Sequence, residues 1–349
     1  MRADPRPHTL ASRRRTGRPA PRLDSSDTLA TQTLTANLLG EWYGRVNAAK
    51  PFLKWAGGKF LFLTRYGNLI PPFEGRYFEP FLGSGATFFH VQRRLGRPVD
   101  SVLGDLNSQL VRMFAEVKER PEEVAAALAA IQEEFDAAED RSVFYYEMRD
   151  RFNESLPTPA AADFIFLNRT CWNGLYRVNR QGKFNVPFGM PKSTQVVPTL
   201  DELLNASAAL LRARLRATSW ENSVAQARPG DFVFLDPPYY SDLLKERSVK
   251  YRVRQFDLAE HERLARRLED LARRGIDFIL TNSGEQEMID LYSGHGLTVN
   301  VFHMPRNISS KTDERANHVP ELLVSPPQDG TTPARVHLQL SLAAAFERV

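Results

Sequence analysis

The sequence has a single cysteine, Cys171, so the chain can form neither an internal disulfide nor a multi-cysteine metal site. Its seven histidines are scattered and include no closely spaced pair of the kind that binds zinc. No apolar run approaches the roughly 20 residues that a membrane-spanning helix needs. We therefore expect no metal and no membrane partner. The 349 residues, 42% hydrophobic and 25% charged, are typical of a globular protein with one large or two smaller domains.

Most of the chain also lacks an excess of positive charge. The net charge is +4, but residues 1–24 carry seven arginines and two aspartates, a balance of +5, so the rest of the chain sums to −1. Residues 1–49 are rich in Pro, Arg, Ser and Thr and have no apolar periodicity, which predicts a disordered basic tail. A phosphate-binding arm, a transit peptide and a start codon assigned too early are all compatible with this composition.

From residue 50 onward, strand-like and helix-like patterns alternate. "GRYFEPFLGSGATFFHVQRRL" predicts a strand, a glycine turn and a helix, a second strand ends at Asp105, and residues 107–155 are helical in pattern. Further helices are expected at 161–169, 200–214, 258–273 and 286–291, and strands at 217–220, 232–235, 276–281, 297–302 and 321–324. This order predicts an α/β sheet interrupted by a helical domain. We assign the sheet to 50–110 and 214–330, the insertion to 111–213, and a C-terminal segment to 331–349.

A glycine turn follows the first predicted strand. Gly83 and Gly85 lie where strand becomes helix, and glycines there let backbone amides approach a ligand. The third position of a dinucleotide fingerprint is Phe88, so a pyrophosphate site is not indicated. Asp105 ends the next strand 20 residues after Gly85, and a carboxylate there can accept both hydroxyls of a ribose. The pattern suggests a nucleoside cofactor without a diphosphate, or simply a strand–helix turn.

The stretch "DFVFLDPPYY" ends a buried strand with an acid, two prolines and two tyrosines. An exocyclic amine on a nucleobase is a poor nucleophile because its lone pair is delocalised into the ring. Two acceptors facing its N–H groups would direct that lone pair outward, and Asp236 and the carbonyl of Pro237 can supply them. Pro238 restricts the backbone of Pro237, and the ring of Tyr239 can stack on the base. This is catalysis by positioning and preorganised electrostatics.

Such an amine lies inside a duplex, so the enzyme must extrude the nucleotide and needs a separate surface for DNA. Residues 164–200 contain no acidic residue. The segment interleaves basic and aromatic side chains with asparagines, which can read base edges: Arg169, Arg177, Arg180, Lys183 and Lys192; Trp172, Tyr176, Phe184 and Phe188; Asn168, Asn173, Asn179 and Asn185. We interpret this segment as the DNA-contacting part of the insertion.

Several stretches in this order resemble the Dam-type (D12 class) DNA adenine-N6 methyltransferases. They are "PFLKWAGGK" (51–59), "FEPFLGSG" (78–85), "GDLN" (104–107), "NRTCWNGLYRVNRQGKFNVPFG" (168–189), "DPPY" (236–239), "TNS" (281–283) and "RNIS" (306–309). The resemblance covers roughly residues 51–325. It implies a Rossmann-like sheet that uses S-adenosylmethionine, with an inserted helical DNA-recognition domain, acting on double-stranded DNA.

The resemblance also implies roles for individual residues. Those at family cofactor positions are Trp55, Lys59, Glu79, Phe81, Gly83, Gly85, Asp105 and Asp236. Those at DNA-binding positions are Lys54, Asn173, Leu175, Arg177, Asn179, Asn185 and Pro187. The catalytic set is Asp236, Pro237, Pro238 and Tyr239. The similar recognition stretch makes GATC the leading target site, although Trp172, "GMPKSTQVV" and residues 240–256 depart from the family pattern.

Other functions fit parts of the sequence. Methylation of cytosine N4 would use the same acceptor pair, and a catalytically idle DNA-binding protein would keep the fold. Cytosine C5 chemistry is disfavoured because it needs a thiolate nucleophile, and Cys171 follows Thr170 inside the DNA-contacting segment. We expect a cytoplasmic, DNA-associated, monomeric protein of a bacterium or phage.

Overall fold

The structure is a computed structural model that describes residues 40–55, 57–97, 99–240, 256–305 and 318–328. Residues 40–48 form a helix, and Val46 and Ala49 are buried, so the predicted disordered tail over 1–49 is wrong in its last part. The error arose because this helix is too short for its apolar residues to show a clear helical period beside the tail. Residues 1–39, the "RNIS" stretch and the segment 331–349 lie outside the described residues.

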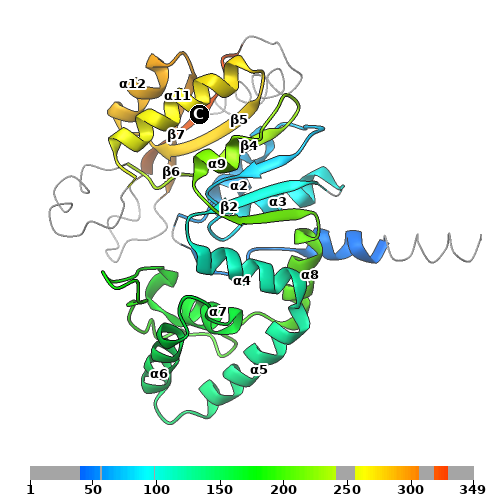
Figure 1. The fold of residues 1–349 in the computed structure, drawn as a ribbon, viewed down its shortest axis with the longest axis vertical. Coiled ribbons are helices and arrows are strands. Elements are labelled where there is room, and N and C mark those ends of the chain that lie inside the picture. The colour runs from blue at the N-terminus through cyan, green and yellow to red at the C-terminus, as the bar shows by residue number, and fades with distance from the viewer. Residues whose placement is uncertain (1–39, 56, 98, 241–255, 306–317, 329–349) are drawn as a thin grey trace, which may run out of the picture. The chain divides into compact units, whose positions relative to one another are not determined.

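Seven strands form one mixed sheet in the order β3-β2-β1-β4-β5-β7-β6, which confirms the predicted α/β class (Figure 1). The strands are β1 (Tyr77–Glu79), β2 (Ser101–Asp105), β3 (Ala213–Ala217), β4 (Phe232–Leu235), β5 (Asp277–Ser283), β6 (Thr298–Pro305) and β7 (His318–Ser325). The first five are parallel to one another, and β7 runs antiparallel to both β5 and β6. The parallel strands therefore end at a common edge.

Both faces of the central strand β4 are buried, as its unbroken apolar run requires. Successive side chains of a strand point to opposite faces. Phe232 and Phe234 accordingly join one core cluster, and Val233 and Leu235 join the other. The first cluster continues into α2 (Phe60–Tyr66), α3 (Ala86–Leu95) and the inserted helices. The second continues into α9 (Trp220–Val224), α11 (Leu258–Arg273) and α12 (Gln286–Gly294). The sheet is thus the middle layer of three.

The helices are α2 (Phe60–Tyr66), α3 (Ala86–Leu95), α4 (Ser108–Glu119), α5 (Pro121–Ala137), α6 (Arg141–Glu154), α7 (Ala161–Thr170), α8 (Leu200–Leu210), α9 (Trp220–Val224), α11 (Leu258–Arg273) and α12 (Gln286–Gly294), with 3₁₀ turns η1 (Gly67–Leu69) and η2 (Trp172–Gly174). Side-chain caps mark the start of α4, α6, α8 and α11. Asn107 caps α4 by accepting from two backbone amides, and Thr199 with Glu202 forms a capping box on α8.

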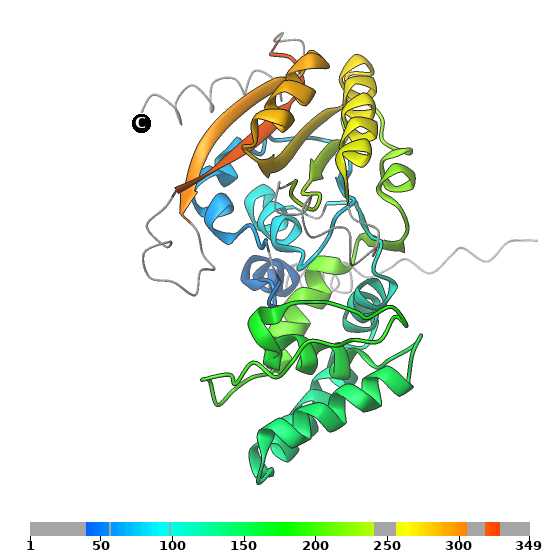
Figure 2. The ribbon, with the colours of Figure 1, turned by 90° about the vertical axis from the view of Figure 1, so that its left-hand side faces the viewer.

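The chain leaves the sheet after β2 and returns to it at β3. α4 packs on β2 and β3, and it also contacts α7 and α8, so it joins the sheet to the inserted helices. Helix α4 ends just before Pro121, and Pro121 is the first residue of α5. Proline has no N–H and fits only the first turn of a helix, so it separates the two helices. Figure 2 shows α5, α6 and α7 grouped in green beyond the sheet.

Most predicted elements have the expected place, but one pair of boundaries was wrong. Helix 200–214 and strand 217–220 were expected, whereas α8 ends at Leu210 and the strand is Ala213–Ala217. Arg214 and Arg216 alternate with less polar residues, and both are exposed because β3 is an edge strand. Their charge concealed the period-2 pattern of an edge strand.

Candidate active site and DNA-contacting surface

Four of the sequence-predicted segments meet at the carboxyl edge of the parallel strands. The glycine turn follows β1, Asp105 ends β2, Asp236 follows β4, and Thr281 lies near the end of β5. Because parallel strands end at one edge, the sheet topology alone brings these residues together. Ligands of open α/β sheets bind at this edge, so it is the candidate active site.

The glycine turn and Asp105 are joined by hydrogen bonds. Gly83 N donates to Asp105 Oδ2 at 3.1 Å, and Asn107 N donates to Asp105 Oδ1 at 2.9 Å. Burial raises the pKa of Asp105, and these backbone donors oppose the shift. A carboxylate offers about four acceptor sites. Asp105 therefore keeps acceptor capacity for hydroxyl groups after it has fixed the turn.

The turn needs glycine at both positions, since Gly83 and Gly85 have positive φ angles of 50° and 71°. A Cβ atom on Gly83 would lie 3.0 Å from the ring of Trp55. Trp55 in turn stacks on Tyr176, with ring centroids 6.0 Å apart and planes 19° apart. Tyr176 belongs to the insertion and also stacks on Phe164, at 5.7 Å. An aromatic stack thus connects the glycine turn to the inserted domain.

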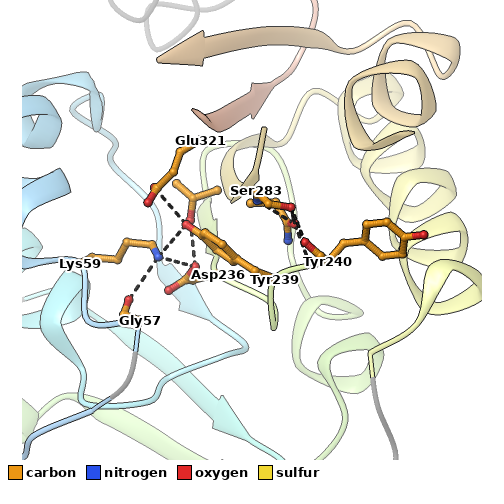
Figure 3. A network of polar contacts seen from close by, with 9 residues as sticks. Gly57, Lys59, Asp236, Tyr239, Tyr240, Ser283 and Glu321 are labelled. Carbon is orange, nitrogen blue, oxygen red and sulfur yellow. Dashed lines mark hydrogen bonds and ion pairs between the residues drawn. The ribbon is translucent and has the colours of Figure 1, made fainter. Parts of the chain in front are cut away.

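Asp236 binds both a cation and a hydroxyl through a single oxygen. Lys59 Nζ lies 2.7 Å from Asp236 Oδ1, and Thr281 Oγ1 donates to the same Oδ1 at 3.0 Å (Figure 3). The Asp236 side chain is 20% exposed, and burial raises its pKa while Lys59 opposes the shift. Among the described residues, Lys59 and Thr281 both contact Asp236 through Oδ1. Oδ2 is therefore the oxygen that can accept from a ligand.

All three protons of the Lys59 ammonium have acceptors in this chain. Besides Asp236, Lys59 donates to the hydroxyl of Tyr239 at 2.9 Å and to the carbonyl of Gly57 at 3.3 Å. The Tyr239 hydroxyl donates onward to Glu321 Oε2 at 3.1 Å. Figure 3 shows the resulting chain of contacts from Glu321 on β7 to Asp236.

Two residues of β5 that hold the DPPY turn were not predicted from the sequence. Tyr240 N donates to Asn282 Oδ1 at 3.2 Å, and Ser283 Oγ donates to the carbonyl of Tyr240 at 2.6 Å. Asn282 and Ser283, with Thr281, form the "TNS" stretch, to which the resemblance gave no role. A row of polar residues at the end of an apolar strand indicates side chains that need polar partners. Glu321, which precedes the apolar run of β7, is a similar case.

Glu79, also at a predicted cofactor position, is buried at the end of β1. It accepts from the hydroxyl of Tyr77 at 2.8 Å. Burial raises the pKa of Glu79 to about 8, the Tyr77 hydrogen bond opposes the shift, and the charge of Asp236 adds to it. The neighbouring Phe81 is half-buried and packs against Phe256. Pro237 is buried and Pro238 is exposed.

The predicted DNA residue Lys54 is fixed by the inserted domain. Asn168 is buried and clamps the backbone of Lys54, accepting from its N–H at 2.9 Å and donating to its carbonyl at 2.7 Å. Lys54 Nζ donates to the carbonyl of Arg169 at 3.0 Å. Gly174, with φ +64°, lies so close that a Cβ there would be 2.4 Å from Lys54 Cβ. Only glycine fits this approach.

The remaining predicted DNA residues lie on the loops after α7. Arg177 donates to Asn185 Oδ1 at 2.8 Å and to its carbonyl at 3.1 Å, and the two residues are joined through their backbones. Asn179 caps the tip between them by accepting from the amides of Gln181 and Lys183. Asn173 has a left-handed φ of 54° and is exposed. Leu175 is half-buried and Pro187 exposed.

Three cations at or beside this segment donate hydrogen bonds to neutral groups, and Arg169 also lies near the charge of Glu202. Arg177 binds an amide side chain, Lys54 binds a carbonyl, and Arg169 donates to the carbonyls of Val196 and Phe52. These contacts orient the cations without cancelling their charge. The surface suits a polyanion.

Comparison with known proteins places this geometry in a family. A model of the D12 class N6 adenine-specific DNA methyltransferases matches residues 55–305. The chain belongs to this family. This methyltransferase is 33% identical over 288 residues to the type II methyltransferase M.MjaIII of Methanocaldococcus jannaschii, covering 79% of this chain and 98% of that protein.

Two further relatives have similar coverage. The DNA adenine methylase of Escherichia coli is 33% identical over 276 residues, which cover 78% of this chain and 94% of that protein. The type II methyltransferase M1.LlaDCHI of Lactococcus lactis is 28% identical over 286 residues, 79% of this chain and 95% of that protein. The protein is therefore an enzyme, an adenine-specific DNA methyltransferase, and the resemblance identified from the sequence is confirmed.

The family implies S-adenosylmethionine as the methyl donor, and the carboxyl edge of the sheet fits it. Asp105 has acceptor sites left for ribose hydroxyls, and it lies beside the glycine turn, where it accepts from the backbone amide of Gly83. The carboxyl groups of Asp105 and Asp236 suit the positive charges of a sulfonium and an amino group. No helix in the part of the chain that the structure describes is long and apolar enough to cross a membrane, and no metal-binding cluster occurs among those residues.

Proposed function

We propose that this methyltransferase modifies N6 of an adenine that is flipped out of duplex DNA at a GATC-like site. The observation that carries the proposal is the pair of contacts on Asp236 Oδ1 from Lys59 and Thr281, which leaves Oδ2 to accept from the target amine. We assign the second acceptor to the carbonyl of Pro237, which the next residue, Pro238, holds in an extended conformation.

The residues of the chain prepare the amine for attack. Asp236 and Pro237 would hold the two N–H groups, so that the nitrogen lone pair points away from them toward the methyl group. S-adenosylmethionine, when bound, supplies that methyl group on a positively charged sulfur. The positive charge moves to the nitrogen as the methyl group is transferred, and the Asp236 carboxylate stabilises this charge before the extra proton leaves to solvent. Tyr239 is proposed to stack on the flipped base.

Binding roles follow the same geometry. We assign Trp55, Lys59, Glu79, Phe81, Gly83, Gly85 and Asp105 to the cofactor side, and residues 111–213 to a DNA-recognition domain. The DNA side comprises Lys54, Asn173, Leu175, Arg177, Asn179, Asn185 and Pro187. The neutral partners of its cations and the absence of acids from 164 to 200 support this assignment. The match of the recognition stretch to the family pattern supports the GATC-like site.

Methylation of a plasmid followed by mapping of modified bases tests the proposal. The expected product is N6-methyladenine confined to GATC or a close variant. N4-methylcytosine, or adenine methylation with no common site, would contradict it.

Asp236→Ala tests the chemistry separately. It should abolish methylation, because the amine loses its charged acceptor, while circular dichroism and cofactor-independent DNA binding stay near wild type. A matched control is Asp290→Ala, which removes a carboxylate from the exposed side of α12. Near-wild-type turnover by the Asp236 variant would eliminate the proposed mechanism.

A further inference from the structure

The chain of contacts that holds Asp236 does not stop at the DPPY turn. Glu321 lies on β7, where its backbone pairs with Ser283 of β5 and Phe302 of β6, so it is inside the sheet rather than on a loop. A carboxylate in this position is unusual, because the next three residues of β7, Leu322 to Val324, are fully buried and apolar. Its observed partner is the hydroxyl of Tyr239, at 3.1 Å.

The direction of each hydrogen bond between Lys59, Tyr239 and Glu321 follows from which group can donate a proton. A lysine ammonium can only donate, so the Tyr239 hydroxyl accepts from Lys59 at 2.9 Å. Its single proton then points to Glu321. With Glu321 as acceptor, the Tyr239 oxygen presents a lone pair to Lys59, and the Lys59 ammonium is held between this oxygen and Asp236 Oδ1.

We propose that Glu321 is a positioning residue for methyl transfer, acting through Tyr239 and Lys59 on Asp236. This inference rests on the proposed role of Asp236 as the acceptor for the target amine. Without the Glu321 carboxylate, the Tyr239 hydroxyl is free to rotate and to donate elsewhere, and Lys59 loses one of the partners that fix its position. Asp236 would then present its Oδ2 less accurately to the base.

The charges of Glu321, Lys59 and Asp236 give the proposal a second consequence. Glu321 and Asp236 are two carboxylates around one ammonium, so the negative charge of each disfavours ionisation of the other. Burial raises the pKa of Glu321, Lys59 opposes the shift and Asp236 adds to it. Glu79 of β1 and Thr281 of β5 also face Asp236, and neither changes with Glu321. The pH dependence of the methylation rate should therefore differ between Glu321→Gln and wild type.

The experiment compares single-turnover methylation by Glu321→Gln, Glu321→Ala, Tyr239→Phe and the Tyr239→Phe/Glu321→Gln double variant, at saturating cofactor and duplex. Glutamine keeps an acceptor for the Tyr239 hydroxyl and should slow methyl transfer about 10-fold, whereas alanine should slow it about 100-fold. Cofactor affinity should stay within about 2-fold of wild type. Glu285→Gln, which removes a carboxylate from an exposed side chain, is the matched control and should leave the rate unchanged.

The double variant separates positioning from a general loss of structure. If Glu321 acts through Tyr239, the double variant should be no slower than Tyr239→Phe alone. Effects that multiply in the double variant would overturn the proposal. So would a wild-type rate in Glu321→Gln, or a pH profile of that variant identical to the wild-type profile. Asp236→Ala is run in parallel: activity in that variant would defeat the proposed function itself, whereas an inactive Asp236→Ala with a normal Glu321→Gln would defeat only the role of Glu321.

Discussion

Replacing Lys59 with methionine tests whether the ammonium keeps Asp236 ionised. Methionine preserves most of the side-chain length but removes the charge that lies 2.7 Å from Asp236 Oδ1. Removing one partner of a buried ion pair costs about 3–5 kcal/mol, because the other charge is left uncompensated. We take about 3 kcal/mol, since the Asp236 side chain is 20% exposed and keeps its hydrogen bond from Thr281. The same loss of attraction raises the pKa of Asp236, because the ammonium no longer stabilises its carboxylate form.

The sign follows from the charge. Lys59 lowers the pKa of Asp236 against the effect of burial, so its removal raises that pKa and protonates Asp236 over a wider pH range. Single-turnover methylation at saturating cofactor, measured from about pH 5.5 to 9.5, should show an acid limb at higher pH than in wild type, with part of the activity regained at high pH. Lys50→Met is the control, because Lys50 is 59% exposed and pairs with Glu202 instead. A Lys59→Met enzyme that is slow but has the wild-type acid limb would refute the reasoning and confine Lys59 to cofactor binding.

Three further changes test other parts of the molecule. Arg177→Ala removes the side chain that Asn185 orients. It should lower discrimination between the target site and a one-base mismatch by about 10- to 100-fold, with cofactor affinity unchanged. Weaker cofactor binding in calorimetry would contradict the assignment of Arg177 to the DNA side. Gly174→Ala should destabilise the fold by about 1–3 kcal/mol, because φ is +64° and the new Cβ would meet Lys54, and a denaturant midpoint equal to wild type would contradict this. Asp105→Ala should weaken cofactor binding about 10-fold or more by removing the acceptor that also fixes the Gly83 amide, and unchanged affinity in equilibrium dialysis would exclude that role.

The sequence was most informative where local pattern and topology agree. The β4 strand and helix α11 have the predicted bounds because an unbroken apolar run and a clear 3.6-residue period define them. Asp105 and Asp236 were correctly placed at strand ends, and parallel pairing then brings them to one edge without further information. The edge strand β3 was misplaced because solvent-facing arginines mask its alternation.

The contacts between distant segments could not be read from the sequence. Asn168 binds the backbone of Lys54, 114 residues away, and Glu321 binds Tyr239 across 82 residues. Each is a single polar residue beside or within an apolar stretch, which shows that a partner is needed but not which one. The sequence therefore predicts the chemistry of Asp236 better than the residues that orient it.

The return of the chain to the sheet at β3 has a consequence for how such enzymes can diverge. β2 and β3 pair directly over five residues each, from Ser101–Asp105 to Ala213–Ala217, although about a hundred residues separate them. The residues between β2 and β3 therefore form one long crossover connection of the sheet, with α4 at its start and α8 at its end. A lineage can thus change the loops that we propose to contact DNA, and even exchange them for those of another member, while the strand pairing and the residues around Asp236 are inherited intact.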